Sequence, residues 1–366
     1  MRQTAALYPF CSELLPVVRA LGRGHGDYML TELLAPPGLG LAGHDAGHAS
    51  NHPTVGITVT DDIDVATSAW ETLLVFRTVT TIIDTDSLVS VASRVLAAGK
   101  NVHWFGVNGD DEEDSLYALL ETFPEQMHIV FRNKVDETEF GLFDDFTKLT
   151  TPVILIGGLV TQADTCEVMF RLKEQLITKG YHPSLVSRYP MGRLFGCSML
   201  DHIFCDGFLT EAQKITRLNL LLRTIEFSER PDIILVEAPD ALMRYSDLAV
   251  NGYGIQSYML SQAIQPDYLV CCVPFELAES GFLAALSTDF HGRLGASICA
   301  VHVSNIIVDS FAVMQSHEIS YVHTKMERVV DHIRASEMTS PIIPLSNVLY
   351  DDARSICEAL FSSLEA

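Results

Sequence analysis

Positive charge is scarce in this chain of 366 residues, in which 24 Lys and Arg stand against 47 Asp and Glu, for a net charge of −23. Affinity for DNA or RNA comes largely from Lys and Arg that neutralise phosphates. No basic run is present, so the composition argues against nucleic acid as a partner. An acidic surface suits a cationic protein or peptide, and it also serves solubility.

Long apolar runs are lacking as well. No run reaches the roughly 18–20 residues that a membrane-spanning helix needs. The first ten residues, MRQTAALYPF, contain neither the long apolar core of a secretory signal nor a clear cleavage site. We therefore expect a cytoplasmic protein that makes no contact with a membrane.

No C-x-x-C pair occurs among the eight cysteines. Most of them lie in apolar runs, which predicts reduced, buried thiols. Cys197, His202 and Cys205 are residue types that bind metals, but their spacing matches no standard zinc pattern. Ordinary packing is the favoured interpretation of these three.

What the chain does have is a regular alternation of apolar strand-like runs with helical patterns, which is typical of an open, mostly parallel sheet. The length suggests about two domains. An irregular polar stretch at 133–150 marks the boundary. We therefore expect an α/β protein with a Rossmann-like domain at 1–148 and a P-loop-NTPase-like domain at 149–366. Its second sheet should hold Ile154, Ile234, Val270 and Ala300 in central parallel strands.

The most informative stretch is 151–170, TPVILIGGLVTQADTCEVMF. An apolar run at 152–156 leads to Gly157 and Gly158, then to a polar loop, then to a helical pattern that starts near Thr165. A buried strand, a glycine loop and a helix in this order form a phosphate-binding loop.

One position of that loop contradicts its expected chemistry. Against the template G-x-x-x-x-G-K-[ST], Gly158 takes the first glycine, Ala163 the second, Asp164 the lysine and Thr165 the hydroxyl residue. An aspartate repels the phosphate that a lysine would bind. Nucleotide binding is therefore predicted to be weak or absent, unless a basic residue from elsewhere replaces the lysine. The candidates for that replacement are Lys173, Arg188 and Arg193.

An apolar run at 233–236 ends in Glu237, and Asp240 follows. A carboxylate at the end of such a strand often holds magnesium in a nucleotide site. The alternative is a closing acid that caps the next turn. If the site takes a cofactor, it is a nucleotide with Mg²⁺, and no catalytic residue is assigned. The candidate cofactor-binding residues are Gly157, Gly158, Thr161, Gln162, Asp164, Thr165, Glu237 and Asp240.

The first half contains a second glycine pattern, PPGLGLAG at 36–43, which has the letters of G-x-G-x-x-G. It follows two prolines and opens no helical pattern, so a plain loop is favoured over a dinucleotide site. The adjoining residues His44, Asp45, His48 and His52 could bind zinc or iron by type. A solvated polar loop is the favoured interpretation, with a metal site as the alternative.

Two resemblances add to this. The runs PDIILVEAPDALM, QPDYLVCCVP and GASICAVHVSN are similar in layout to dethiobiotin-synthetase-like P-loop proteins. The runs LYPF, PPGLGLAGHDA, VGITVTDD, GGLVTQADTCEVMFRLKEQLITKGY, LFG and YGIQSYMLSQAIQPDY resemble the clostridial-type peptide maturation system proteins across nearly the whole chain. That family accompanies gene sets for ribosomally made, modified peptides, often with radical SAM enzymes.

Three functions follow as hypotheses. The favoured one is an accessory maturation protein that binds a precursor peptide or a radical SAM modifying enzyme through a degenerate nucleotide-binding fold. The alternatives are a nucleotide-dependent ligase or kinase that acts on the peptide, and a dinucleotide-dependent oxidoreductase. A homodimer held by the second domain is expected, because closed two-fold dimers are the commonest oligomers. Apolar helices near 220–222 and 278–286 are the predicted interface.

Overall fold

The computed structural model describes residues 2–63, 68–77, 83–106, 110–130, 146–161, 163–338, 343–351 and 353–365. Contacts divide the chain into two compact units. Unit 1 comprises Met1–Lys134 and Pro190–Gly196, and unit 2 comprises Val135–Tyr189 and Cys197–Ala366. The sequence analysis placed the boundary near residue 148, with each domain formed by one continuous segment. The contacts divide the chain earlier, and they group Pro190–Gly196 with the first unit.

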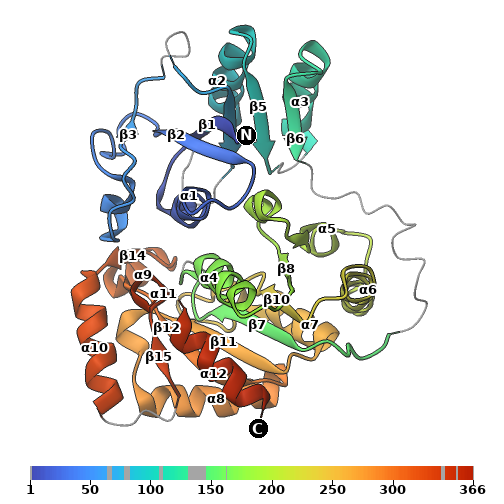
Figure 1. The fold of residues 1–366 in the computed structure, drawn as a ribbon, viewed down its shortest axis with the longest axis vertical. Coiled ribbons are helices and arrows are strands. Elements are labelled where there is room, and N and C mark those ends of the chain that lie inside the picture. Colours follow the sequence, from blue (N-terminus) through green and yellow to red (C-terminus); the bar gives the residue numbers. More distant parts are fainter. Residues whose placement is uncertain are drawn as a thin grey trace. The chain divides into compact units, whose positions relative to one another are not determined.

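Unit 1 is built on a six-stranded sheet with the order β3-β2-β1-β4-β5-β6 (Figure 1). Every neighbouring pair in it is parallel. This is the strand order of dinucleotide-binding folds. The strands are β1 (Gln3–Tyr8), β2 (Tyr28–Leu34), β3 (Val59–Thr60), β4 (Thr72–Phe76), β5 (Asn101–Phe105) and β6 (Met127–Val130).

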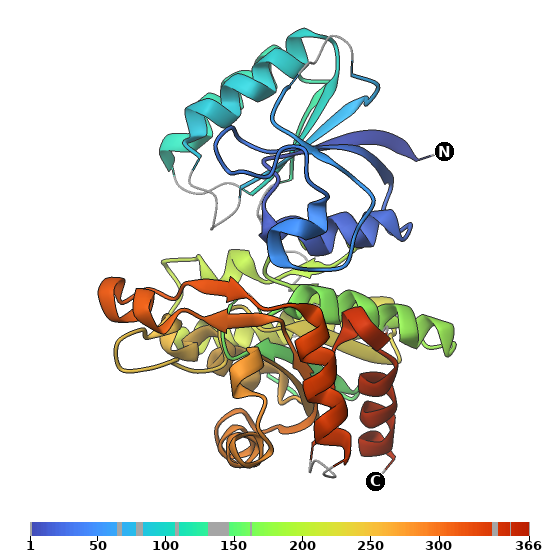
Figure 2. The ribbon, with the colours of Figure 1, turned by 90° about the vertical axis from the view of Figure 1, so that its left-hand side faces the viewer.

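Helices cover both faces of this sheet, as Figure 2 shows. On one face lie α2 (Thr85–Ala97) and α3 (Asp110–Thr122), and on the other lies α1 (Leu15–Gly22). The apolar face of α2 packs on the sheet, since Leu88, Ala92 and Val95 share one core with Trp104. Spacings of three and four residues place these side chains on one side of the helix. The short 3-10 helices of unit 1 are η1 (Ser12–Leu14), η2 (Ala46–Ser50) and η4 (Pro190–Phe195).

Unit 2 is built on a seven-stranded sheet with the order β15-β12-β11-β7-β10-β8-β9. All its neighbouring pairs are parallel. Its strands are β7 (Val153–Gly158), β8 (Pro183–Ser187), β9 (Ser198–Met199), β10 (Ile233–Glu237), β11 (Tyr268–Val273), β12 (Ser297–Val303) and β15 (Leu345–Ser346). A separate antiparallel pair follows β12 and consists of β13 (Ile306–Val308) and β14 (Tyr321–His323).

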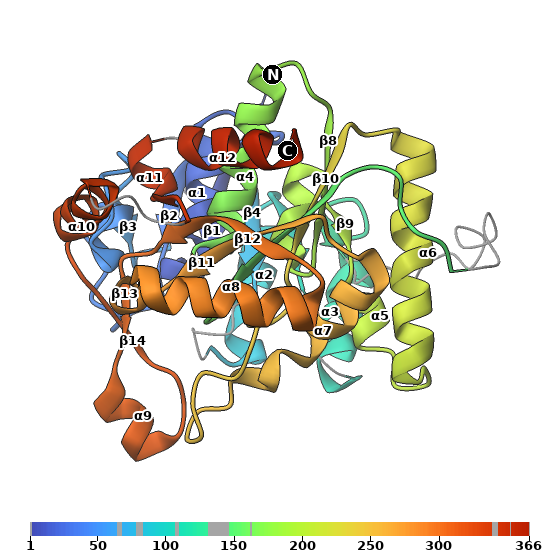
Figure 3. The same ribbon diagram turned by 90° about the horizontal axis from the view of Figure 1, so that it is seen from below.

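The helices of unit 2 are divided between the two faces of the sheet (Figure 3). On one face, α4 (Thr165–Thr178) packs beside α12 (Arg354–Leu364), and on the other lie α7 (Ile255–Ile264) and α8 (Ser280–Leu294). The long α6 (Glu211–Glu229) packs on α7. The remaining helices are α5 (Asp201–Phe204), η5 (Asn251–Gly254), η6 (Phe275–Leu277), α9 (Ser310–Ser316), α10 (Met326–Met338) and α11 (Val348–Asp351).

The predicted fold class is confirmed. The chain has a Rossmann-like open sheet followed by a P-loop-NTPase-like parallel sheet. Ile154, Ile234, Val270 and Ala300 lie in β7, β10, β11 and β12, and each of these strands has a parallel neighbour on both sides. Parallel strands buried on both faces read as continuous apolar runs, and for this reason the sequence located them.

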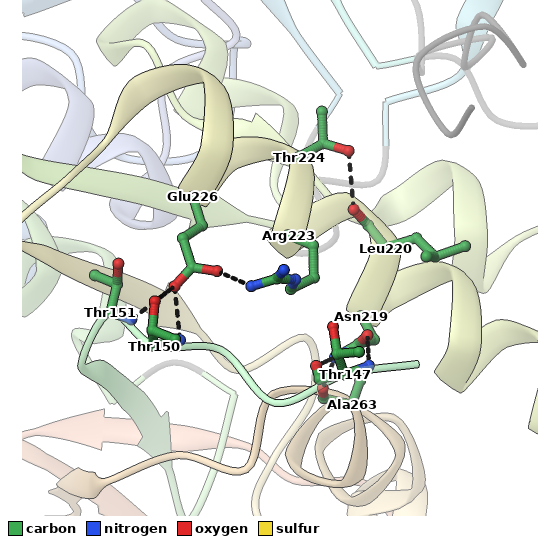
Figure 4. A network of polar contacts seen from close by, with 9 residues as sticks. All are labelled: Thr147, Thr150, Thr151, Asn219, Leu220, Arg223, Thr224, Glu226 and Ala263. Atoms are coloured by element: carbon green, nitrogen blue, oxygen red, sulfur yellow. Dashed lines mark hydrogen bonds and ion pairs between the residues drawn. The ribbon is translucent and has the colours of Figure 1, made fainter. Parts of the chain in front are cut away.

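The segment at 147–151 is fastened to α6 within unit 2, as Figure 4 shows. Asn219 Oδ1 accepts from the Thr147 N–H (3.1 Å), and Asn219 Nδ2 donates to the carbonyls of Thr147 (2.9 Å) and Ala263 (2.8 Å). Glu226 Oε1 accepts from the backbone N–H groups of Thr150 and Thr151. These bonds make the polar residues around 148 part of the second unit.

Candidate functional site

The candidate site lies at the carboxyl edge of the unit 2 sheet, where the strand order reverses. In the sheet, β10 and β8 lie on one side of β7, and β11 and β12 lie on the other side. Ligands of open α/β sheets bind at such a switch point. Gly158 pairs with Cys272 and Cys272 pairs with His302, so these three residues form one row across β7, β11 and β12.

The loop at 158–165, called here the reversed loop, leaves β7 through two tightly packed glycines. A Cβ on Gly158 would stand 2.4 Å from the Val160 carbonyl oxygen, and one on Gly157 would stand 2.4 Å from Leu242 Cδ2. At Gly158 the atom in the way is backbone, so only glycine fits there, whereas a side chain at Gly157 would have to displace the Leu242 side chain. Gln162, a predicted site residue, lies outside the described residues.

Thr165 and Glu237 are in direct contact, as the phosphate-loop interpretation requires. The Thr165 hydroxyl, in the first turn of α4, donates to Glu237 Oε1 at 2.8 Å. The Ser187 hydroxyl, at the end of β8, donates to Glu237 Oε2 at 2.5 Å. The pKa of the fully buried Glu237 is raised above its ordinary value, because burial outweighs these two hydrogen bonds, which lower it. The two residues that the sequence analysis assigned to the hydroxyl and the carboxylate of a nucleotide site are thus hydrogen-bonded to each other.

Asp164, at the position of the lysine, is held by a histidine. Asp164 Oδ2 accepts from Nε2 of the fully buried His302 at 3.1 Å, and His302 Nδ1 accepts from the Val348 N–H at 3.3 Å. The second bond fixes the tautomer, because an accepting Nδ1 leaves the ring proton on Nε2. Asp164 has left-handed backbone (φ 62°), and its side chain does not cap α4. The carboxylate is turned toward β12.

Two further polar groups from β14 lie beside the reversed loop. The hydroxyls of Thr161 and Tyr321 are 3.3 Å apart. Burial lowers the pKa of His323, and the nearby Asp164 carboxylate acts in the opposite direction. The β14 residues Tyr321 and His323 thus lie near the reversed loop, Tyr321 at Thr161 and His323 within reach of the Asp164 charge.

The thiols near the loop have raised pKa values. Burial raises the pKa of Cys272 well above its ordinary value, and the charges of Asp164 and Glu237 raise it further. Burial, together with the Glu237 charge, does the same to Cys166. Because the thiolate is the nucleophile, neither residue suits covalent chemistry.

Asp240 serves as a helix cap. Its carboxylate accepts from the backbone N–H groups of Gln256 (3.1 Å) and Ser257 (2.8 Å) at the start of α7. Burial raises the pKa of Asp240, against these hydrogen bonds and the charge of Arg188, which lower it. Asp240 therefore caps the start of α7.

The three basic residues considered as replacements for the lysine lie in different settings. Arg188 donates through one guanidinium nitrogen to the Pro239 carbonyl and to Gln256 Oε1, both at 2.9 Å. Lys173 lies eight residues into α4, about 12 Å along the helix from its first residue. Arg193 belongs to unit 1. Arg188 thus contacts the segment after β10 and the first turn of α7, and Lys173 lies about two turns along α4.

The residues proposed for a metal in unit 1 have other roles. Asp45 accepts backbone N–H bonds from Gly47, Val55 and Gly56. Burial raises the pKa of Asp45, but its backbone hydrogen bonds outweigh that effect and lower it. The rings of His44 and His48 stack at 4.5 Å, nearly parallel. Among the described residues, which include His52, no three His, Cys, Asp or Glu are arranged to hold a metal ion.

The glycine pattern at 36–43 follows β2 and leads into η2. In dinucleotide-binding folds the glycine-rich turn joins the first strand to the first helix. Here that turn, between β1 and η1, has the sequence Pro9-Phe10-Cys11 and contains no glycine. The arrangement is that of a plain loop.

Sequence reasoning missed Ser187, His302, Tyr321 and His323. A signal existed for His302, because it is the one charged or strongly polar residue inside the run ICAVHV. Ser187 likewise ends an apolar strand. Tyr321 and His323, in β14, carry no such signal, because β14 lies far from the loop in the sequence and comes near it only in the folded chain.

No protein-family model and no curated protein matches this sequence. Among solved structures, the chain is similar to a DUF1611 family protein from Anabaena variabilis, with a TM-score of 0.64 and 11% identity over 99% of this chain and 100% of that one. It also matches the signal recognition particle receptor FtsY from Elizabethkingia anophelis, with a TM-score of 0.28 and 13% identity over 61% of this chain and 72% of that one. The first match shows a shared fold along the whole chain.

The described residues contain no helix long and apolar enough to cross a membrane.

Proposed function

We propose that this protein is an accessory protein of peptide maturation, which binds a precursor peptide or its radical SAM modifying enzyme through a P-loop-like unit that has lost nucleotide hydrolysis. The observation that carries the second half of this proposal is the Asp164–His302 hydrogen bond at the position of the phosphate-binding lysine. The peptide and its enzyme enter through the sequence resemblance described above. A cytoplasmic location belongs to the same proposal.

Electrostatics support the loss of nucleotide binding. A carboxylate 4 Å from a phosphate charge costs on the order of 1–4 kcal/mol, depending on the local dielectric. The buried His302 holds this carboxylate in place. The favourable attraction of a lysine is replaced by a repulsion of similar size.

The whole chain's charge supports a peptide partner. With −23 at neutral pH, the protein attracts basic segments and accelerates their association at low ionic strength. A basic leader or core segment of a precursor peptide has this character.

A calorimetric titration with Mg-ATP tests the nucleotide half. We expect no binding tighter than about 100 µM, which corresponds to about −5.5 kcal/mol. Asp164→Asn removes the repulsion alone, and Asp164→Lys also restores an attraction. Affinity should therefore rise in the order wild type, Asp164→Asn, Asp164→Lys. Low-micromolar binding by the wild type would overturn the proposal.

Titration with peptides encoded beside the gene tests the partner half. A precursor peptide should bind with an affinity that falls as salt rises, because charge complementarity steers the complex. Capture of the radical SAM enzyme without the peptide would favour the enzyme as the direct partner.

A nucleotide-dependent ligase or kinase is the second candidate, and the Thr165–Glu237 hydrogen bond favours it. In that case Glu237→Gln and Thr165→Val should each abolish turnover of ATP in the presence of peptide. Under the accessory function there is no turnover to abolish. The dinucleotide-dependent oxidoreductase has no comparable support from unit 1, because its β1 turn lacks glycine.

A further inference from the structure

Two histidines lie side by side on the sheet of unit 1. His103 in β5 and His128 in β6 are paired in the parallel register, so their side chains lie on the same face of the sheet. The residues next to them, Trp104 and Met127, belong to the core beneath α2 and α3. Since successive side chains of a strand alternate between the faces, the histidines lie on the face opposite α2 and α3, which Figure 2 shows. His128 is exposed and His103 is partly buried, so solvent reaches the pair.

The separation and tilt of the two rings suit a shared metal ion. Their centroids are 4.7 Å apart, and their planes meet at 77°. The lone pair of an imidazole nitrogen lies in the ring plane, so an ion that binds two rings must lie in both planes. Two imidazoles that bind one ion through nitrogens at about 2.0–2.1 Å have centroids roughly 4.5–5.2 Å apart, for right-angled to tetrahedral bonds. The observed separation falls within this range.

A second histidine pair of unit 1, His44 and His48, has a different geometry. Its ring centroids are 4.5 Å apart, and its planes are nearly parallel, at 10°. Parallel planes have no point in common close to both rings, so stacked imidazoles do not share an ion. The tilt of the rings therefore distinguishes the two pairs, and His44 and His48 serve as an internal control.

Tyr28 holds the ring of His103. Its hydroxyl is hydrogen-bonded to His103 Nδ1, and the two rings meet edge to face with centroids 5.6 Å apart. Since β1 and β4 lie between β2 and β5, this bond reaches across the sheet. The remaining nitrogen of His103, Nε2, makes no hydrogen bond with the residues that the structure describes, and neither does the ring of His128. A hydrogen bond at the other ring nitrogen is how metal-binding histidines are oriented.

We propose that His103 and His128 bind a divalent metal ion of the zinc type, with His103 contributing Nε2 and donating its Nδ1–H to the Tyr28 oxygen. Imidazole nitrogen suits zinc, nickel and copper, whereas magnesium and calcium prefer oxygen ligands. No further His, Cys, Asp or Glu of the described chain joins the pair, so water or a donor from another molecule completes the coordination. In this arrangement Tyr28 is a positioning residue. The inference goes beyond the proposed function and does not depend on it.

Calorimetry with Zn²⁺ tests the site in the full-length protein, with Mg²⁺ as the control ion. His128→Gln should weaken Zn²⁺ binding at least about tenfold, because it removes one of the two protein ligands. The matched control is His48→Gln, which removes an exposed histidine of unit 1 from the stacked pair and should leave the affinity unchanged. The eight cysteines can also bind Zn²⁺, so the difference between the two variants measures the site, and total uptake does not.

Tyr28→Phe tests the positioning role, because it keeps the aromatic ring and removes only the hydroxyl. It should weaken Zn²⁺ binding about tenfold. With Zn²⁺ bound, the His103 Nδ1–H should give a slowly exchanging NMR signal in the wild type, and Tyr28→Phe should lose this signal. Equal Zn²⁺ affinity of the wild type and His128→Gln, an equal loss in His48→Gln, or Mg²⁺ binding at the same histidines would overturn the inference.

Discussion

Four consecutive residues, Asn251 to Gly254, have left-handed backbone, with φ between 48° and 69°. Gly254 needs its lack of a side chain, because a Cβ there would stand 2.5 Å from the Leu242 carbonyl oxygen. Asn251 donates to the Leu159 carbonyl at 3.2 Å and so attaches this turn to the reversed loop. Tyr253 is more than half exposed and has no evident packing reason for its strained conformation.

Tyr253→Gly should stabilise the protein. Left-handed backbone costs an L-residue about 1–2 kcal/mol, and the greater freedom of unfolded glycine offsets about 0.5–1 kcal/mol of that. A gain of about 0.5 kcal/mol is expected in urea unfolding. Tyr258→Gly, in the right-handed α7, serves as the control and should lose about 1 kcal/mol. A loss of similar size in both variants would mean that Tyr253 is held by packing.

Glu237 should make stability fall as the pH rises. Burial raises the pKa of this carboxyl above its ordinary value of 4.5. The folded state therefore binds its proton more tightly than the unfolded state does. This contribution is fully present below about pH 4.5 and is lost as the pH rises through the folded pKa. Glu237→Gln should remove this dependence, and the variant should gain on the wild type between pH 4 and 8.

Glu226 should give stability the opposite pH dependence, and pH profiles of unfolding test both residues. Burial raises its pKa, but the hydrogen bonds from Thr150 and Thr151 outweigh burial and lower it. Its contribution is present above the unfolded pKa and is lost as the pH falls. Glu226→Gln should therefore cost stability at pH 7 and little at pH 3. Parallel pH profiles for the two variants would contradict both assignments.

At the scale of elements, α6 begins with a complete capping box. The Thr210 hydroxyl accepts from the Gln213 N–H at 3.3 Å, and Gln213 Oε1 accepts from the Thr210 N–H at 2.9 Å. This helix receives the 147–151 segment through Asn219 and Glu226, so its start matters to unit 2 as a whole.

Thr210→Ala should destabilise unit 2 by about 1 kcal/mol, because it leaves a first-turn amide without its cap. Thr216→Ala, within the same helix, is the control. It replaces a threonine whose hydroxyl donates to the Ala212 carbonyl of the same helix, and alanine's higher helix propensity should make it neutral or slightly stabilising. Thermal unfolding of both variants decides the matter, and equal effects would show that the cap contributes nothing.

For the whole molecule, a homodimer remains a prediction, and the structure changes where its interface must lie. Leu222, Ala278, Leu283 and Leu286, from the helices predicted to form it, are buried in the core of unit 2. Large apolar side chains that stay exposed include Ile255 and Tyr258 on α7 and Phe311 and Met314 on α9. An interface through unit 2 has to use surfaces of this kind.

Light scattering at low and high salt tests the dimer. A mass of about twice 40.4 kDa is expected under both conditions. Screening relieves the repulsion between two acidic chains and leaves apolar burial intact. A mass of 40.4 kDa at both salt concentrations means a monomer.

The sequence by itself determined the fold class and the central strands of unit 2. Parallel strands that are buried on both faces consist of continuous apolar residues, such as Val153–Ile156, and these runs are visible in the sequence. It also determined the reversed charge, since Asp164 is read directly against a motif. Both depend on neighbours along the chain.

Only the tertiary structure decided what those residues do. It joined Thr165 to Glu237 across 72 positions, it turned Asp164 toward His302 across 138, and it made Asp240 a helix cap. It also buried apolar side chains of the segments 220–222 and 278–286 in the core of unit 2. Such contacts depend on which strands lie side by side and on which face each side chain takes, and no local pattern in the sequence records either.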